Sequence, residues 1–411
     1  MFRQMKTVLS ALALAAAGLA AAPAYAQQNP AEVKVGVLVP LSGIYARLGN
    51  IMRMGAELGV EHINAAGGIK SLGGAKLKIV LIDAGDSTEK AKNAAQRMVA
   101  QEPDMVAATG SYLSSFTLAA TEVTERAGLP FLTLSFSDLI TSRGFKYVFQ
   151  TSATAGDMSE RAVPEIIRLA ETVSGKRPKK IAIITDNTAS SQSSVKPIRE
   201  RLAKELGLEL LFDETWTPPM ADATPLVQRV RANRPDLLLF VPTATSDAKL
   251  FLEKMNEFGL AQARVPVLTF TVSAVDPDLL KTMDPSLLEG LMTIVGNWGF
   301  KGHDKLQADL KAKFGEPWLT QNAISTYGDM WIVKEALEAA GKADKEAVAQ
   351  ALRTIDTREG AARYFPGGRL KFDEKGRRVD ASFCVVQWQK GVSVTVYPDD
   401  IAVAKPVWVK Q

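Results

Sequence analysis

The sequence predicts an α/β protein built from two doubly wound parallel-sheet lobes. Three observations support this class. Short apolar strands alternate with amphipathic helices. This alternation stops and restarts once, near residue 150. The chain of 411 residues is also too long for one ordinary domain. Its hydrophobic content of 46% and charged content of 23% fit a globular protein with a sizeable core.

The first 26 residues read as a secretory signal peptide. Arg3 and Lys6 precede an apolar run, Pro23 interrupts it, and residues 24–26 form a small-x-small cleavage site. The run is shorter than the roughly 20 apolar residues of a membrane span. Because no cysteine lies at the cleavage point, a lipid anchor is not expected. We therefore expect export to the periplasm, with cleavage after Ala26.

The first unit contains four predicted strands and three predicted helices. Runs of valine, isoleucine and leucine indicate strands buried on both faces, and apolar residues at helical spacing between capping signals indicate helices. The expected strands cover residues 33–39, 77–82, 104–109 and 129–134. The expected helices cover about 51–64, 86–98 and 115–127.

The second unit repeats the pattern after residue 150, and the chain then ends in antiparallel-looking strands. Strands alternating with helices again predict a parallel sheet covered on both faces. The expected strands of this unit cover residues 179–184, 209–212, 236–241 and 265–270, and its helices 195–206, 224–232 and 248–258. The tail strands are expected at 368–372, 383–389 and 392–397.

Composition argues against several function classes. The formal net charge is only +4 and the basic residues are scattered, so no nucleic-acid partner is expected. Cys384 is the single cysteine and is expected to be a small buried apolar residue. The two histidines, His62 and His303, lie in no nucleophile or metal motif, and no phosphate-binding loop is present. We expect neither an enzyme, nor a metal site, nor a cofactor.

Hydroxyl-rich loops follow the predicted strands. In open α/β sheets, ligands bind at the carboxyl ends of strands, where helix N-termini present free N–H groups. Each serine, threonine or aspartate there also has a simpler interpretation as a helix N-cap. Together, however, the loops predict a polar cleft. They cover residues 40–45 with Tyr45, 110–115 with Tyr112, 135–138, 185–192 and 242–247.

Four segments resemble the leucine/isoleucine/valine-binding protein family, the type I periplasmic binding proteins of ABC importers. The resemblance covers essentially the whole chain after the signal peptide. The segments are Val35-Gly36-Val37-Leu38-Val39-Pro40-Leu41-Ser42-Gly43, Gly55-Ala56-Glu57-Leu58, Ile63-Asn64-Ala65-Ala66-Gly67-Gly68-Ile69 and Arg143-Gly144-Phe145-Lys146-Tyr147-Val148-Phe149.

The resemblance implies two lobes joined by a three-crossover hinge, with a small molecule bound between them. The first lobe is expected to comprise residues 31–151 and 276–378, and the second 152–275 and 379–411. It also implies a membrane permease as partner and a monomeric chain. A sensor-coupled binding protein would use the same cleft, and the sequence leaves that alternative open.

The resemblance also suggests ligand-binding residues. Ser114 matches the serine that binds an amino-acid carboxylate at a helix start. Ser135 and Ser137 match a strand-end pair that contacts both ends of the ligand. Asp247 aligns with the acidic residue that binds the α-ammonium group, although its position also suits the first turn of a helix.

Other positions depart from the pattern of branched-chain amino-acid binders. Ser190 stands where many relatives have a tyrosine, Leu48 where an aromatic residue is common, and Phe136 where a small residue is usual. Trp298 either lines the cleft or belongs to the core. The ligand is therefore expected to be a small amino acid or related carboxylate, with an aromatic acid or a small amide such as urea as alternatives.

Overall fold

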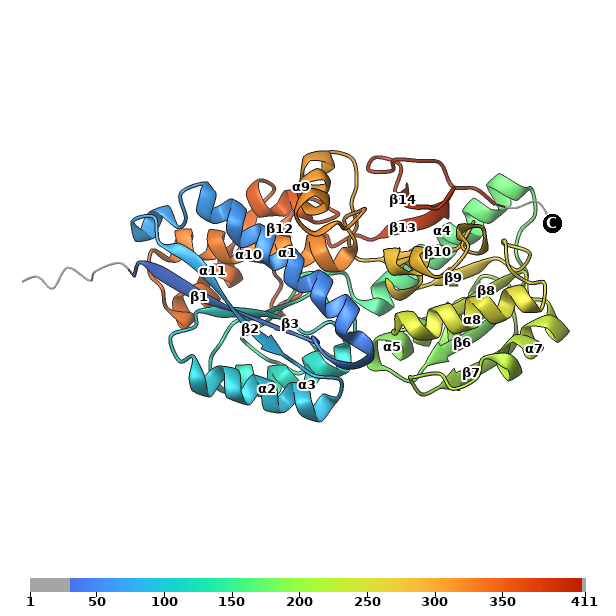
Figure 1. Ribbon diagram of the computed structural model, residues 1–411, viewed down its shortest axis with the longest axis horizontal. Coiled ribbons are helices and arrows are strands. Elements are labelled where there is room, and N and C mark those ends of the chain that lie inside the picture. Colours follow the sequence, from blue (N-terminus) through green and yellow to red (C-terminus); the bar gives the residue numbers. More distant parts are fainter. Residues whose placement is uncertain (1–29, 409–411) are drawn as a thin grey trace, which may run out of the picture.

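The structure is a computed structural model that describes residues 30–408. The expected signal peptide, residues 1–26, lies outside this range. Two α/β lobes stand side by side, each with one large sheet (Figure 1). The predicted fold class is therefore confirmed.

The first lobe has a fully parallel five-stranded sheet in the order β2-β1-β3-β4-β5. Its strands are β1 (Glu32–Val39), β2 (Lys76–Asp83), β3 (Ala107–Gly110), β4 (Phe131–Thr133) and β5 (Val148–Gln150). Helices cover both faces, as parallel sheets require. They are α1 (Ala46–Ala65), α10 (Gln321–Ala340) and α11 (Lys345–Thr354) on one face, and α2 (Thr88–Gln101) and α3 (Ser114–Arg126) on the other (Figure 1).

The second lobe has a seven-stranded sheet in the order β14-β13-β10-β9-β8-β6-β7. Its parallel strands are β6 (Lys180–Asp186), β7 (Glu209–Trp216), β8 (Leu237–Val241), β9 (Val267–Thr269) and β10 (Met292–Val295). Two antiparallel strands extend it, β13 (Cys384–Gln389) and β14 (Val392–Tyr397).

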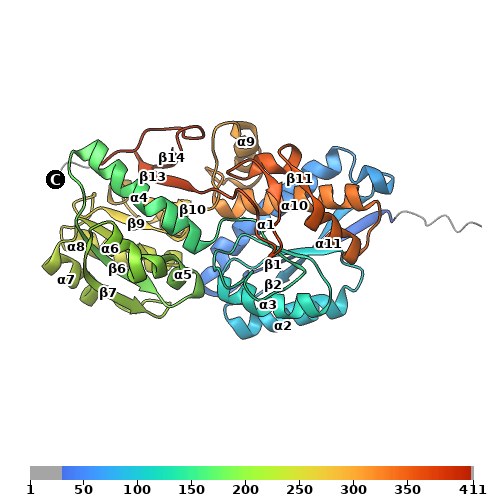
Figure 2. The same cartoon turned by 180° about the vertical axis from the view of Figure 1, so that it is seen from behind.

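Helices cover this sheet as well. The face seen from behind in Figure 2 carries α4 (Ala155–Ser174) and α5 (Ala189–Pro197), which continues through a π-helical turn, Ile198–Leu202, into α6 (Ala203–Glu205). The opposite face carries α7 (Thr224–Asn233) and α8 (Thr245–Glu257). Outside the two sheets lie α9 (Asp304–Phe314) and a small hairpin of β11 (Asp356–Thr357) and β12 (Leu370–Lys371).

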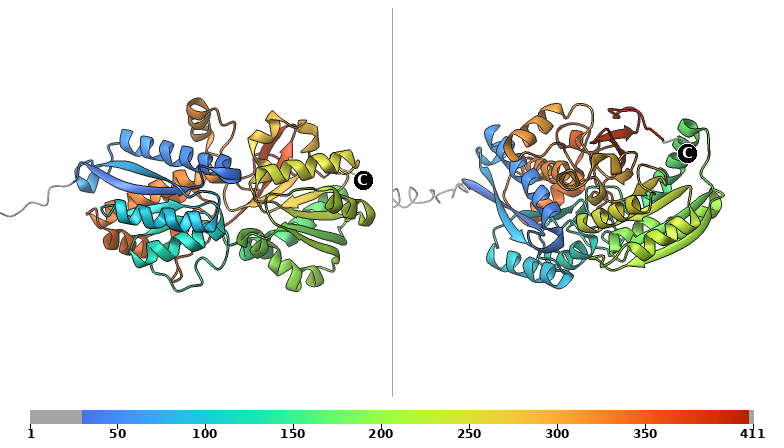
Figure 3. Two further views of the ribbon diagram at one scale, coloured as in Figure 1. Left: turned by 60° about the horizontal axis from the view of Figure 1, so that its bottom comes forward. Right: turned by 45° about the vertical axis from the view of Figure 1, so that its right-hand side comes forward.

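The chain passes between the lobes three times, after β5, after β10 and after β12 (Figure 3). These crossovers pack closely together. A Cβ on Gly296, in the second crossover, would lie 2.9 Å from the Cβ of Ser152 in the first. The buried Arg378, in the third, donates to the backbone oxygen atoms of Thr151, Pro366 and Arg369. The expected three-crossover hinge is therefore present.

Several elements differ from the sequence-based expectation. Strand β10 pairs with β9 and β13 in the second sheet, and the segment from residue 276 links it to β9. The expected assignment of residues 276–378 to the first lobe is therefore wrong for residues 276–295. The remaining lobe boundaries stay a prediction. The helix expected at 195–206 begins at Ala189, because Thr188 caps it through the N–H of Ser191. Strands β5, β10 and β11 and helices α4, α9, α10 and α11 were not predicted.

Candidate functional site

The carboxyl ends of both sheets meet at the boundary between the lobes and enclose a small cavity. Its volume is about 20 Å³, enough for roughly one water molecule. Residues of both lobes line it: Tyr112, Leu113, Leu134, Ser135, Phe136, Ser190, Thr243, Thr271, Val272 and Gln321. This is the edge at which the hydroxyl-rich loops were expected to converge.

Each of the three serines expected from the first lobe takes part in a hydrogen bond at this boundary. The Ser114 Oγ accepts the N–H of Ser137 at 3.0 Å, and the Ser135 Oγ donates to the backbone oxygen of Tyr112 at 2.9 Å. Ser135 lines the cavity, whereas Ser114 and Ser137 lie beside it. The N-cap of α3 is Leu113 and not a serine, so the hydroxyl of Ser114 is not used for capping.

Two tyrosines of the first lobe reach the second lobe at this boundary. The Tyr112 hydroxyl donates to the backbone oxygen of Thr243 at 2.8 Å, and the rings of Tyr112 and Tyr45 lie 6.2 Å apart. Burial raises the pKa of Tyr45 to about 12, so its hydroxyl stays neutral. Ser137 makes a second link, 3.0 Å from the Oγ of Ser193 on α5. In this structure the lobes are therefore closed on each other.

Asp247, the residue expected to bind an ammonium group, does not line the cavity. It is buried in the first turn of α8, where its Oδ2 accepts the indole N–H of Trp216 at 2.9 Å and its Oδ1 accepts the hydroxyl of Ser246. The carboxylate thus has partners within the protein, which favours its structural interpretation.

Trp298, expected either at the cleft or in the core, is 1% exposed and belongs to a hydrophobic core. It does not line the cavity. Leu48 is likewise a core residue. Phe136 and Ser190 do line the cavity, from opposite lobes. Their roles in ligand binding, like those of Ser114, Ser135, Ser137, Tyr45 and Tyr112, remain predictions.

Sequence reading did not single out Asp186, Thr243, Thr271 or Gln321. Asp186 ends β6 and is fully buried. Its Oδ1 accepts the N–H and hydroxyl of Thr188, and its Oδ2 accepts the N–H and hydroxyl of Thr243. Burial raises its pKa. The sequence did contain one indication of the importance of Asp186. This residue follows a predicted buried strand and lies in a loop that was expected at this edge of the sheet.

An ion-pair cluster also joins the lobes. Arg47, on α1, contacts Asp276 at 3.3 Å and Asp278 at 3.1 Å, both of which follow β9 of the second lobe. Its guanidinium also binds Glu316 through two hydrogen bonds of 2.6 and 2.8 Å. Asp276 and Glu316 are buried, so the single arginine neutralises carboxylates that water does not reach.

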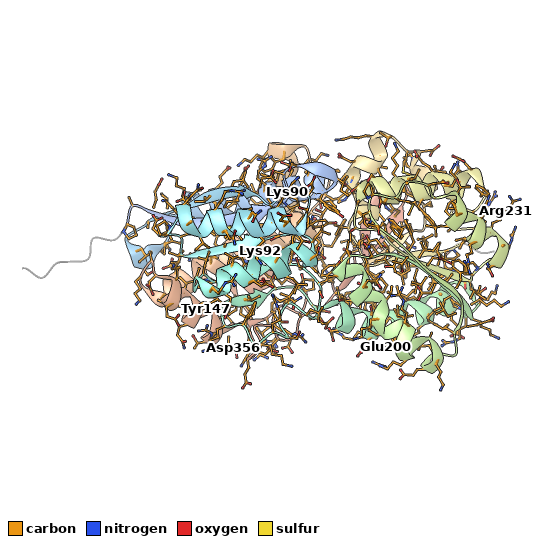
Figure 4. The ribbon with its side chains drawn as sticks, turned by 90° about the horizontal axis from the view of Figure 1, so that it is seen from below. Lys90, Lys92, Tyr147, Glu200, Arg231 and Asp356 are labelled. Carbon is orange, nitrogen blue, oxygen red and sulfur yellow. The ribbon has the colours of Figure 1, made fainter. Side chains whose placement is uncertain are left out.

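A larger hollow of about 510 Å³ lies beside the cavity, at the outer boundary of the lobes. Asp138 and Leu139 of the first lobe form one side, and residues of α4, α5 and the following turn form the other. One of these, Glu200, is labelled on the surface of the second lobe in Figure 4. Three acidic and three basic side chains line the hollow, so it carries no dominant charge.

Between residues 30 and 408 no group of three or more His, Cys, Asp or Glu side chains is arranged to hold a metal ion. Over the same residues, no helix combines the length and apolar character that a membrane crossing needs.

A family model described as periplasmic binding protein matches residues 32–392. The chain belongs to the periplasmic binding protein family. This is a family of transporter solute-binding proteins rather than a class of enzymes. The Leu/Ile/Val-binding protein homolog 7 of Brucella melitensis is 31% identical over 410 residues, covering 98% of this chain and 99% of that protein. The resemblance seen in the sequence is therefore confirmed.

Solved structures show the same fold for this periplasmic binding protein. The leucine binding protein LivK of Thermotoga maritima superposes with a TM-score of 0.74 at 21% identity, covering 90% of this chain and 100% of that one. A solute binding protein of an ABC transporter from R. palustris, in complex with benzoate, gives 0.73 at 19% identity, covering 92% and 100%.

Proposed function

We propose that this chain is the exported binding component of an ABC importer. The protein is a monomer in the periplasm. It captures a small carboxylate, either an amino acid or an aromatic acid, between its lobes and delivers this ligand to a membrane permease. The observation that carries this proposal is the hydroxyl-lined cavity at the joined carboxyl ends of two sheets. The names of the relatives support transport, and their ligands, leucine and benzoate, both carry a carboxylate.

Ligand entry requires the lobes to part. The cavity of about 20 Å³ is far smaller than leucine or benzoate, and the Tyr112–Thr243 hydrogen bond closes it. Ligand binding then stabilises a closed state only through contacts that the open state lacks. A permease that docks with both lobes would distinguish loaded from empty protein by this closure.

A thermal-shift screen of the purified protein without residues 1–26 tests the proposal. We expect at least one small carboxylate to raise the melting temperature, because a ligand that binds only the folded state stabilises it by mass action. The screen covers amino acids, aromatic acids, amides and urea. If no carboxylate shifts the melting temperature while urea or an amide does, the proposed ligand class is wrong.

Ser114→Ala tests the serine group directly. The Oγ accepts the Ser137 N–H and keeps its own hydrogen for a ligand, so we expect carboxylate binding to weaken by about 1–3 kcal/mol in calorimetry. Ser87→Ala is the matched control. It removes a true N-cap, on α2, and should reduce stability by about 1 kcal/mol without changing affinity. Unchanged affinity in Ser114→Ala removes that residue from the site.

A further inference from the structure

Gln321 presents an amide donor to the cavity. It is the first residue of α10, is 2% exposed and lines the cavity wall. Its Oε1 accepts the backbone N–H of Gly296 at 2.8 Å. Because that N–H can only donate, the side-chain amide is held in one orientation, with its Nε2 directed away from Gly296. Among residues 30–408, no acceptor forms a hydrogen bond with this Nε2.

The surroundings of Gln321 offer further donors. Thr320, the N-cap of α10, makes no side-chain capping bond, so the first N–H groups of this 20-residue helix lack that partner. Across the cavity, Ser190 is 8% exposed, and its Oγ has no hydrogen-bond partner among the described residues. A helix start, an amide and a hydroxyl thus provide donors that suit an anionic oxygen.

No carboxylate is available to a cationic group in the same place. No acidic or basic side chain lines the cavity. The nearest candidates are Asp186, whose two oxygens hold four hydrogen bonds from Thr188 and Thr243, and Asp247, which is bonded to Trp216 and Ser246. An ammonium group buried here without a carboxylate partner loses its hydration without compensation.

The rest of the wall suits an apolar ligand body. Leu113, Leu134 and Phe136 come from the first-lobe side and Val272 from the second. These side chains offer no hydrogen bonds to a second polar group on the ligand. The cavity therefore combines donors at one part of its wall with an apolar surface elsewhere.

We propose that Gln321 binds the ligand carboxylate through Nε2 and that the natural ligand is an apolar monocarboxylate without an ammonium group. Aromatic acids and 2-oxo acids belong to this class, and α-amino acids do not. This inference rests on the proposed function and specifies its ligand. It assigns to Gln321 a role that the sequence did not suggest.

Calorimetry on matched pairs tests the ligand class. Leucine is compared with 4-methyl-2-oxopentanoate, and phenylalanine with 3-phenylpropanoate, so that each pair differs chiefly at the ammonium group. Benzoate and benzamide form a third pair, which tests the need for the negative charge. We expect each acid without an ammonium group to bind at least tenfold more tightly than its amino acid, and benzoate more tightly than benzamide. Leucine binding as tight as that of its oxo acid overturns this inference and leaves the proposed function standing.

Gln321→Glu tests the residue. The substitution keeps an oxygen for the Gly296 N–H and replaces the donor by a carboxylate oxygen, so the fold is retained and the ligand carboxylate is repelled. We expect at least a hundredfold loss of affinity for the tightest acid of the panel, with an unchanged melting temperature of the free protein. Gln350→Glu, at an exposed position on α11, is the control and should bind normally.

Gln321→Ala is a second test of the role of Gln321, for use if Gln321→Glu folds poorly. It removes the donor without adding charge and should weaken binding about tenfold. Normal acid binding by either folded variant refutes the role of Gln321. A wild-type protein that binds no acid and no amino acid overturns the proposed function together with this inference.

Discussion

Many buried polar side chains at the boundary between the lobes form hydrogen bonds with residues that are distant in the sequence. The sequence therefore identified only some of the residues that line the cavity. Ser114, Ser135 and Ser137 were identified because they lie in hydroxyl-rich loops after predicted strands and match positions of the family pattern. Gln321 was missed because it comes from α10, more than 180 positions later, and only the fold brings it to the same cavity. The partner of Asp247, the Trp216 indole, comes from strand β7, 31 positions earlier. Sequence position thus predicts which loops lie close together, but not which of their side chains already form hydrogen bonds with other protein groups.

One buried carboxyl makes stability depend on pH. Asp329, on α10, is fully buried, and its Oδ2 accepts the hydroxyl of Thr109 at 2.6 Å, while its Oδ1 has no partner. Burial raises its pKa to about 7 from an ordinary value of 3.8. Between these two values the folded protein holds a proton that the unfolded chain has released. The free energy of unfolding therefore falls as pH rises through this window.

We expect Asp329→Asn to remove this dependence, because an amide keeps the acceptor for Thr109 and does not ionise. Relative to the variant, the wild type should lose up to roughly 4 kcal/mol of unfolding free energy between pH 4 and pH 8. Urea denaturation at both pH values measures the difference. Asp399→Asn, at an exposed position, is the control. A wild type and an Asp329→Asn variant with parallel pH profiles would contradict the prediction.

At the scale of elements, the strands of both parallel sheets were largely predictable, because burial on both faces gives continuous apolar runs. Helix α10 was not, because residues on nearly all its sides are buried, including Asn322, Ser325 and Thr326. It therefore shows no amphipathic period. Strand β10 was missed for a different reason. It is only four residues long, and no helical repeat precedes it to mark a βα unit.

Arg378 joins backbone segments of the crossovers through hydrogen bonds. This buried guanidinium donates to three backbone oxygen atoms, at 2.7 to 3.0 Å, and lies over the ring of Phe365. We expect Arg378→Met to reduce the free energy of unfolding by at least roughly 3 kcal/mol, since three buried acceptors lose their donor. Chemical denaturation measures this.

The exposed Arg231, labelled in Figure 4, is the control for this substitution. It lies on α7, far from the crossovers in the chain, and its guanidinium is placed over the ring of Phe258. Arg231→Met should change stability by less than about 0.5 kcal/mol. Equal losses in the two variants would show that Arg378 contributes no more than a surface arginine.

For the whole molecule, the Arg47 cluster links the two lobes outside the cavity. Its bonds to Asp276 and Asp278 connect α1 to the second lobe. We expect Arg47→Gln to weaken ligand binding at least tenfold, because closing the lobes then leaves buried carboxylates without a cation. Small-angle X-ray scattering should show a larger radius of gyration for the free variant than for the wild type.

Arg53→Gln is the matched control on the same helix. Arg53 pairs with Glu57 one turn away and makes no contact with the second lobe. It should leave both affinity and radius of gyration unchanged. If Arg47→Gln binds as tightly as Arg53→Gln, the cluster does not contribute to closure.

Strand β13 is synthesised late, although it lies inside the second sheet. Its residues are among the last of the described chain, yet β13 lies between β10 and β14 and covers the edge of β10. A nascent chain that ends before residue 384 therefore exposes an unpaired strand edge and lacks a finished second lobe. We therefore expect the second lobe to complete its folding only after residues 384–397 have been synthesised.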